Sequence, residues 1–428
     1  MMGLKILGAA LLTTAVCTMV RASEWCGANA SGTAQAGVWS SNDSPGWNGT
    51  GVPNAQGAVA YFGSAKKNVV TQDITEGITI GSLILDLAPT VDKVDLMLNG
   101  PKDSLGPIIL DQDGPGPGCA VISNNAARVR MQIGTSAPVT LNDDLLMVNT
   151  TPDTYARTFS ISITAKISGK GNITIDNQLD RPDNGAILLS NASSDFEGDV
   201  LIRRGCAKAQ NNKAYGKTTN VVTLGAEGYG DATLCFEGTA LTFAYPVVVS
   251  PVTGGRMRIF GEVLAADPKK DCAVTMTGAL TLNGDVVFDI PAKPYATKDW
   301  SYLHTVKAPI SGVGALIKEN SGTLVIQKVN TGNSYTGGTV LKAGVLSLKG
   351  GATLGTGALD VYEGATLDLD GDVTVQSLSL DGKLQPKGVY AATDNSTEAG
   401  VVKVAWLTGT GKLTATAGKQ PGLISAVR

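Results

Sequence analysis

Residues 333–355 read NSYTGGTVLKAGVLSLKGGATLG, and residues 194–205, SDFEGDVLIRRG, repeat their pattern in a weaker form. Three residues of the earlier segment correspond to residues of the later one at a single offset: Phe196 to Tyr335, Gly198 to Gly337, and Gly205 to Gly344. A glycine at the same step of two similar segments indicates a turn that the backbone makes twice.

The sequence around these two segments recurs as well. ISGKGNITI at 167–175 parallels ISGVGALI at 310–317, and DATLCFEG at 231–238 parallels GATLDLDG at 364–371. Short apolar strands and glycine turns in a shared order are typical of a chain that stacks similar coils into a solenoid.

The composition of the 428-residue chain favours strands over helices. Charged residues make up 17% and aromatic residues 5%, and the 53 glycines follow no Gly-X-Y period. The scarcity of charge argues against a disordered tail, and the missing period excludes collagen. Because Val, Leu, Ile, Thr and Gly together suit strands joined by tight turns, we expect an all-β protein.

Alternating polar and apolar residues predict half-buried strands in the C-terminal third, at 365–369 and 377–381. Glycines recur between the strands, where a coil turns a corner and positive φ is often required, and we expect Gly337 and Gly344 at such corners. Hairpin turns at the same spacing would give a sandwich or a barrel. We favour a parallel β-helix, because coil stacking produces a pattern that recurs along the chain.

Residues 1–22 have the features of a secretory signal: a basic start at Lys5, an apolar stretch from 6 to 20 and a small-residue cleavage site ending at Ala22. We therefore expect a secreted protein, extracellular or held at the cell surface. No later apolar run reaches the ~18 residues that a membrane helix needs, so no transmembrane segment is expected after the signal is cleaved.

The remaining chain divides into a cap, a solenoid and a tail. Residues 23–64 contain Trp39, Trp47, Tyr61 and Phe62, a dense aromatic group that we expect to cover the first coil. Residues 65–418 are expected to form the solenoid, with repeat-like units near 165–238 and 308–371. Residues 419–428 form a C-terminal tail.

Cysteine and histidine are too few for a predicted metal centre. Of the six cysteines one lies in the signal, so an odd number remains, and His304 is the only histidine. No cofactor or metal site is expected.

Cys206 and Cys235 are separated by about one coil, and stacked positions on adjacent coils lie ~5 Å apart. They are therefore the predicted disulfide.

Carboxylates could serve a calcium site or a glycosidase, but the surrounding motifs favour ordinary solvated residues. Asp368, Asp370 and Asp372 alternate in LDLDGD without the glycine and the acid that complete an EF-hand loop. Asp111 and Asp113 stand just before a Gly-Pro run and could be read as the two carboxylates of a glycosidase, but acidic residues at turns are common.

Basic residues could likewise supply the base of a pectate-lyase-like enzyme. Arg203 with Arg204, and Arg256 with Arg258, stand without an aspartate cluster at a recognisable spacing, which favours solvated side chains. His304 stands without a Gly-x-Ser-x-Gly elbow, which favours a structural role. Tryptophans could stack on sugar rings, although the N-terminal ones are better explained as a cap. The formal net charge of −3 and the lack of a basic patch argue against nucleic acid as a partner.

The segment GNSYTGGTVLKAGVLSL resembles the autotransporter-associated β-strand repeat, or passenger-associated transport repeat, of secreted bacterial surface proteins. The usual form of that repeat is matched by Tyr335, Thr336, Gly337, Gly338, Thr339, Gly344, Val345 and Leu346. The copy at 194–205 departs from the repeat at Glu197 and Asp199, and at the following Cys206. The repeat proper covers a small part of the chain and a looser resemblance covers most of it. The resemblance implies a β-solenoid passenger outside the cytoplasm.

Two classes of function fit the sequence. The first is a non-enzymatic secreted or cell-surface solenoid, an adhesin or structural passenger-like protein whose partner is a cell-surface glycan or matrix. The second is a carbohydrate-active β-helix enzyme, a polysaccharide lyase or glycoside hydrolase. A groove of carboxylates with Arg or Lys and aromatic residues on one face of the solenoid would favour the enzyme.

Overall fold

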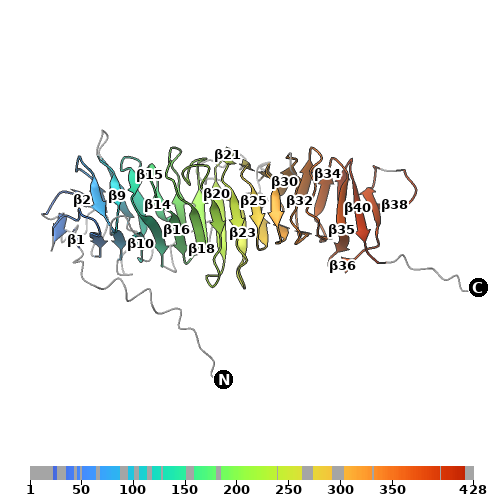
Figure 1. Ribbon diagram of the computed structural model, residues 1–428, viewed down its shortest axis with the longest axis horizontal. Helices are drawn as coiled ribbons and strands as arrows, with labels where there is room; N and C mark the ends of the chain where they lie inside the picture. The colour runs from blue at the N-terminus through green and yellow to red at the C-terminus, as the bar shows by residue number, and fades with distance from the viewer. Residues whose placement is uncertain are drawn as a thin grey trace, which may run out of the picture.

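The computed structural model is an elongated stack of short strands whose order along the chain follows the long axis (Figure 1). Strands of neighbouring coils pair in parallel, and the described residues contain no helix. The predicted all-β parallel β-helix is therefore confirmed. The structure describes residues 23–26, 35–42, 46–48, 51–63, 68–86, 95–100, 106–112, 118–126, 129–150, 159–179, 185–238, 240–262, 273–291, 303–329, 332–395 and 397–419.

Two faces run along the stack. Face A is a column of parallel strands: β1 (Ser23–Cys26), β4 (Val59–Phe62), β7 (Ser82–Leu85), β10 (Cys119–Asn124), β13 (Asp144–Asn149), β16 (Ile173–Asn177), the first part of β18 (Val200–Ala209), β19 (Val222–Leu224), β22 (Val247–Val249), β25 (Leu280–Leu282) and β28 (Ile310–Gly312).

Face B is the second parallel column: β2 (Gln35–Val38), β5 (Asn68–Thr71), β8 (Asp95–Asn99), β11 (Arg130–Ile133), β14 (Phe159–Ile163), β17 (Ala186–Leu189), the second part of β18, β20 (Ala232–Glu237), β23 (Met257–Glu262), β26 (Val286–Asp289), β29 (Leu316–Glu319), β31 (Thr339–Leu341), β33 (Leu359–Val361) and the end of β35 (Val373–Leu380). Strand β18 contributes to both faces, because it bends at Gly205.

Two further parallel sheets complete the coils. The N-terminal one contains β6 (Ile78–Ile80), β9 (Ile108–Leu110), β12 (Val139–Leu141) and β15 (Ile167–Gly169). The C-terminal one, face D, contains β21 (Ala240–Phe243), β24 (Ala273–Met276), β27 (Leu303–Val306), β30 (Thr323–Gln327), β32 (Val345–Lys349), β34 (Thr366–Leu369) and β39 (Leu407–Gly409).

The two ends depart from this regular pattern. At the N-terminal end, β3 (Gly46–Asn48) pairs antiparallel with β1. At the C-terminal end, β40 (Lys412–Ala417) pairs with β35 and with β37 (Gly388–Ala392). Strand β37 also pairs with β38 (Val401–Val404), and β36 (Lys383–Leu384) folds back on β35.

Alternating side chains fill the interior of the coils. In β13, Leu145, Met147 and Asn149 are buried while the residues between them are partly exposed. Asn149 is stacked between Asn124 of β10 and Asn177 of β16, and all three amides are fully buried. These amides form what we call the asparagine ladder.

The asparagine ladder satisfies backbone groups where the chain leaves face A. Asn124 Nδ2 donates to the carbonyl oxygens of Val129 (2.9 Å) and Ser160 (3.0 Å). Asn149 Nδ2 donates to Asn177 Oδ1 at 2.8 Å. Asn177 Nδ2 in turn donates to the carbonyls of Gly185 and Cys206. Buried carbonyls at an irregular corner therefore keep their hydrogen bonds.

Aromatic rings close the N-terminal end of the core. Trp25, Trp39, Trp47 and Phe62 are buried and in ring contact, with centroids of Trp39 and Trp47 4.8 Å apart. Tyr61, grouped with them in the sequence, is instead half-buried on the other side of β4 and donates to Asp86.

Among the described residues no helix is long and apolar enough to span a membrane.

Candidate functional site

The repeat residues occupy equivalent places in two different coils. Phe196 and Tyr335 are both fully buried. The residue after each donates its N–H to the last glycine of an ISG strand in the previous coil: Glu197 to Gly169 O, and Thr336 to Gly312 O, both at 2.9 Å. The repeat that the sequence shows is thus also a structural repeat.

The two copies nevertheless turn different corners. Gly205 (φ +67°) lies where β18 passes from face A to face B, and Gly344 (φ +71°) lies between β31 of face B and β32 of face D. Positive φ at Gly344 agrees with the expected corner. The same expectation for Gly337 is wrong, because the positive φ belongs to its neighbour Gly338 (+89°).

Glycine is nevertheless required at Gly337, because the adjoining coil is too close for a side chain. A Cβ there would lie 2.3 Å from the carbonyl carbon of Gly314, and at Gly198 a Cβ would lie 2.1 Å from Gly171 O. These repeat glycines therefore serve close packing of successive coils.

The predicted disulfide between Cys206 and Cys235 is not formed. Both side chains are buried thiols in one small apolar cluster with Ala186. The register places Cys206 opposite Thr233, and Cys235 opposite Lys208. The two cysteines are therefore diagonal neighbours, about 7–8 Å apart, which is beyond the usual reach of a disulfide.

The acidic residues of LDLDGD are bound to their own protein. Asp368 accepts hydrogen bonds from Ser347 Oγ (2.6 Å), Lys349 Nζ (2.7 Å) and Thr408 Oγ1 (3.2 Å). Burial raises the pKa of this carboxyl, but the Lys349 and Ser347 bonds outweigh it and the pKa is lowered. Asp370 accepts from the N–H groups of Gly350 and Gly351, and Asp372 from that of Lys412.

Other aspartates also bind backbone N–H groups, at the corners of the stack. There an Asp side-chain oxygen accepts a hydrogen bond from an N–H of the next coil at 2.8 Å. Asp199 accepts from Val221, Asp231 from Arg256 and Asp285 from Ala315. Asp111 accepts from Gln56 and Asn142, while Asp113 lies outside the described residues. No group of three or more potential metal ligands occurs in the described part of the chain.

The arginines considered as bases are paired with acids, Arg203 and Arg204 at the end of face A, and Arg256 and Arg258 on face B. Arg203 and Arg204 both contact Asp176, and the Arg203 guanidinium lies 4.9 Å from the ring centre of Tyr229. Arg256 pairs with Glu319 and Arg258 with Asp289, the latter at 3.5 Å. Burial raises the pKa of Glu319, but Lys342 and Arg256 hold it below its usual range.

Sequence reasoning missed two fully buried lysines. Lys208 pairs with Glu237 at 3.1 Å. Lys318 lies on the inner side of β29, opposite Phe288 and Leu341, and its Nζ donates to the carbonyls of Glu319 (2.7 Å) and Ala343 (3.2 Å). Burial lowers the pKa of Lys318 to about 8. A lysine in a strand pattern reads as a surface residue, so no sequence signal revealed these positions.

His304 also points into the core. It is fully buried, lies between Val274 and Leu324 in the register, and neither ring nitrogen has a hydrogen-bond partner among the described residues. Burial, with the nearby Lys318 charge, lowers its pKa to about 4. An imidazole sealed inside the stack is structural, as its isolation in the sequence indicated.

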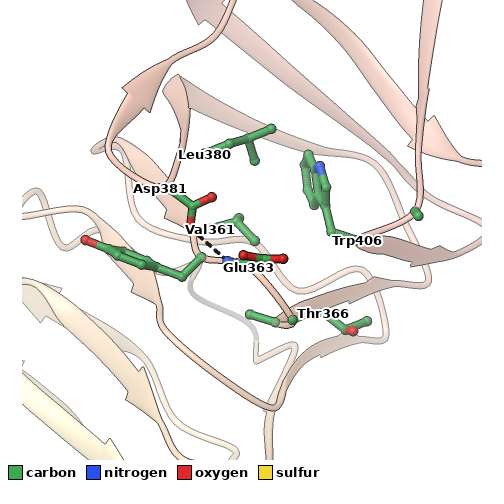
Figure 2. Close-up of a pocket in the computed structure, with 10 residues that line it drawn as sticks. Val361, Glu363, Thr366, Leu380, Asp381 and Trp406 are labelled. Carbon is green, nitrogen blue, oxygen red and sulfur yellow. Dashed lines mark hydrogen bonds between the residues drawn. The ribbon is translucent and has the colours of Figure 1, made fainter.

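One cavity combines aromatic and acidic side chains. This cavity, the Trp406 pocket, has a volume of about 370 Å³. Figure 2 shows Trp406 on one side of it, Asp381 and Leu380 on another, and Glu363 between them. Its lining residues are Val361, Tyr362, Glu363, Gly364, Ala365, Thr366, Leu380, Asp381, Ala405 and Trp406.

The Trp406 pocket lies where the regular stack ends. Between β34 and β39 the chain makes an excursion through β35 to β38, so Trp406 joins a corner that precedes it by about 40 residues in sequence. Asp381 Oδ1 accepts the N–H of Glu363 at 2.9 Å, and Leu367 donates its N–H to Trp406 O at 2.9 Å. These bonds hold opposite walls of the pocket in place.

Comparisons of this chain with protein-family models, with curated proteins and with solved structures gave no match.

Proposed function

We propose that this protein is a non-enzymatic β-solenoid, exported through residues 1–22 and displayed at the cell surface or in the surrounding matrix as an adhesin or structural passenger-like protein. The resemblance of the 332–348 segment to passenger-associated repeats motivates the assignment to this class.

The observation that carries the proposal is that the candidate charged side chains form ion pairs and hydrogen bonds within the protein. A polysaccharide lyase needs a basic residue free to take a proton from the substrate, and a glycosidase needs two carboxylates free to act on it. Here Arg203, Arg204, Arg256 and Arg258 contact acidic side chains, and Asp368 receives three hydrogen bonds. These residues therefore support the joining of coils better than turnover.

A regular surface suits this role for a further reason. A long stack presents the same small polar side chains many times, so weak contacts with a cell or matrix add up through multivalency. Affinity would then depend on display density and not on one deep site.

The test has two measurements on protein purified from residue 23 onward. Incubation with neutral and acidic polysaccharides, with and without calcium, should release no reducing or unsaturated oligosaccharides. Beads densely coated with the protein should adhere to cells or to a glycan matrix, and sparsely coated beads should not.

The alternative is a carbohydrate-active enzyme acting at the Trp406 pocket, where Glu363 and Asp381 line one cavity. Reproducible release of oligosaccharides, abolished by Glu363→Gln or Asp381→Asn, would replace the proposal with this enzyme. The same release abolished by changing an arginine would point to a lyase instead.

A further inference from the structure

We infer that the Trp406 pocket binds a single sugar ring of a neutral glycan, with the ring against aromatic and aliphatic side chains and its hydroxyls toward Glu363 and Asp381. The inference builds on the proposed surface role, for which it names the chemistry of the ligand.

The first argument is that the pocket is built before any ligand arrives. Its floor is formed by Val361 and Ala365, which are each 2% exposed and belong to the core. One wall is fixed by the bond from Glu363 N–H to Asp381, and the other by the bond from Leu367 N–H to Trp406 O. A preformed cavity avoids the ordering cost that a flexible loop would pay on binding.

The second argument is that the walls have the two kinds of surface that a sugar presents. Tyr362 is 37% exposed and Trp406 packs its ring partly on the core, so both offer apolar area to the C–H face of a pyranose. Carboxylates accept hydrogen bonds from hydroxyl groups, and such charge-assisted bonds are stronger than neutral ones. The volume of about 370 Å³ falls within the usual range of small-molecule sites.

The third argument concerns charge. Two acids and no Lys or Arg are found among the residues that line the pocket. The carboxylate of a uronic acid would face two like charges there without a counter-ion, which is unfavourable. The pocket therefore selects neutral or N-acetylated sugars over acidic ones.

The experiment is saturation-transfer NMR on the intact exported chain with six neutral sugars: glucose, galactose, mannose, fucose, N-acetylglucosamine and N-acetylgalactosamine. Galacturonate and 1,5-diaminopentane serve as the acidic and the cationic probe. We expect transfer to at least one neutral sugar, none to galacturonate, and protection of Trp406 from acrylamide quenching, measured against Trp406→Phe.

Two exposed variants locate the site without disturbing the fold. Tyr362→Ala removes an aromatic wall, and Glu363→Gln keeps the N–H that donates to Asp381 while removing the charge. Each should weaken binding at least about tenfold. Tyr229→Ala is the matched control. Tyr229 is 41% exposed and lies in the turn between β19 and β20, away from the strands that form the pocket. Its affinity should equal that of the wild type.

The inference is overturned if none of the six sugars receives saturation, if only 1,5-diaminopentane does, or if Tyr362→Ala and Glu363→Gln bind as the wild type does. Failure here is distinct from failure of the proposed function. A pocket that binds no sugar leaves the absence of polysaccharide turnover intact, whereas oligosaccharide release would refute the non-enzymatic role even if the sugar binds.

Discussion

At the scale of single residues, Gly337 and Gly344 are both required to be glycine, but for different physical reasons. Gly337 faces the backbone of Gly314 in the coil beside it, whereas Gly344 combines a positive φ with a Cβ position 2.4 Å from Gly322 O. Gly254 has positive φ (+72°) and nothing within 4 Å of its Cβ position. Gly254 therefore tests backbone strain alone, Gly337 tests steric collision alone, and Gly344 tests both together.

We predict that Gly254→Ala lowers the free energy of unfolding by about 1 kcal/mol, through strain alone. Gly337→Ala and Gly344→Ala should each cost roughly 1–3 kcal/mol or more. Lys349→Thr is the surface control: it breaks a half-exposed pair with Asp368 and should cost under about 1 kcal/mol. Urea denaturation measures all four, and equal midpoints would contradict the role given to the corners.

His304 makes a prediction about acid. Its pKa of about 4 lies below the 6.5 of an exposed histidine. Between these two pH values the imidazole is therefore protonated in the unfolded chain but neutral in the folded one. Stability should therefore fall as the pH drops from 6.5 toward 4, by about 3 kcal/mol from this residue. His304→Leu, which suits neighbours Val274 and Leu324, should remove that part of the decline. An unchanged pH profile of unfolding in the variant would refute it.

At the scale of elements, the asparagine ladder joins β10, β13 and β16 at the corner after face A. Asn177 makes the most bonds: it accepts from Asn149 Nδ2 and the N–H of Leu179 and donates to Gly185 O and Cys206 O. Asn149 Oδ1, by contrast, has no partner among the described atoms. A fully bonded buried amide is costly to remove, since each abandoned group loses its partner.

We predict that Asn177→Ala destabilises the protein by several kcal/mol, on the order of 1–3 for each buried group left without a partner. Asn149→Ala should cost clearly less. The pair is matched in residue type and burial, so the difference reports mainly on the hydrogen bonds. Thermal unfolding that ranks the two variants in the reverse order would contradict this assignment.

Element-scale details are also where the sequence was least informative. The pattern of apolar strands and glycines predicted the stacked coils, because the burial of each short strand is visible in its own residues. It could not give the register of Cys206 and Cys235, because β18 turns from face A to face B without interruption and so changes the length of that coil. The Trp406 pocket was hidden for a related reason: an excursion of the chain brings Trp406 to Tyr362 and Glu363.

At the scale of the whole molecule, each coil contacts only its neighbours, so stability is distributed along the axis and the ends are the weak points. The N-terminal end is protected by the rings of Trp25, Trp39, Trp47 and Phe62. Trp39, Trp47 and Phe62, which the sequence grouped as a cap, are buried together and in ring contact. Tyr61 was misplaced, since alternation in β4 sends it to the other side.

We predict that Trp47→Ala costs about 3–5 kcal/mol in the first coils and leaves distant coils unaffected. Hydrogen exchange followed by mass spectrometry should show lost protection in β1, β4 and β7, with β29 to β34 unchanged. Trp47→Phe keeps a ring but loses the buried indole hydrogen bond to Trp39 O (2.8 Å), so it should destabilise the first coils less than Trp47→Ala does. Uniform loss of protection along the chain would mean that the stack unfolds as one unit.

The two repeat copies, with Gly205 turning from face A to face B and Gly344 from face B to face D, also bear on how such a scaffold could be redesigned. Both make the same backbone bond to an ISG strand, although the later copy lies one side further round the axis. A strand together with its corner is therefore a unit that fits at more than one side of the coil. A designer could lengthen this scaffold by ~4.8 Å for each added turn, and could rotate a grafted epitope by adding a single side.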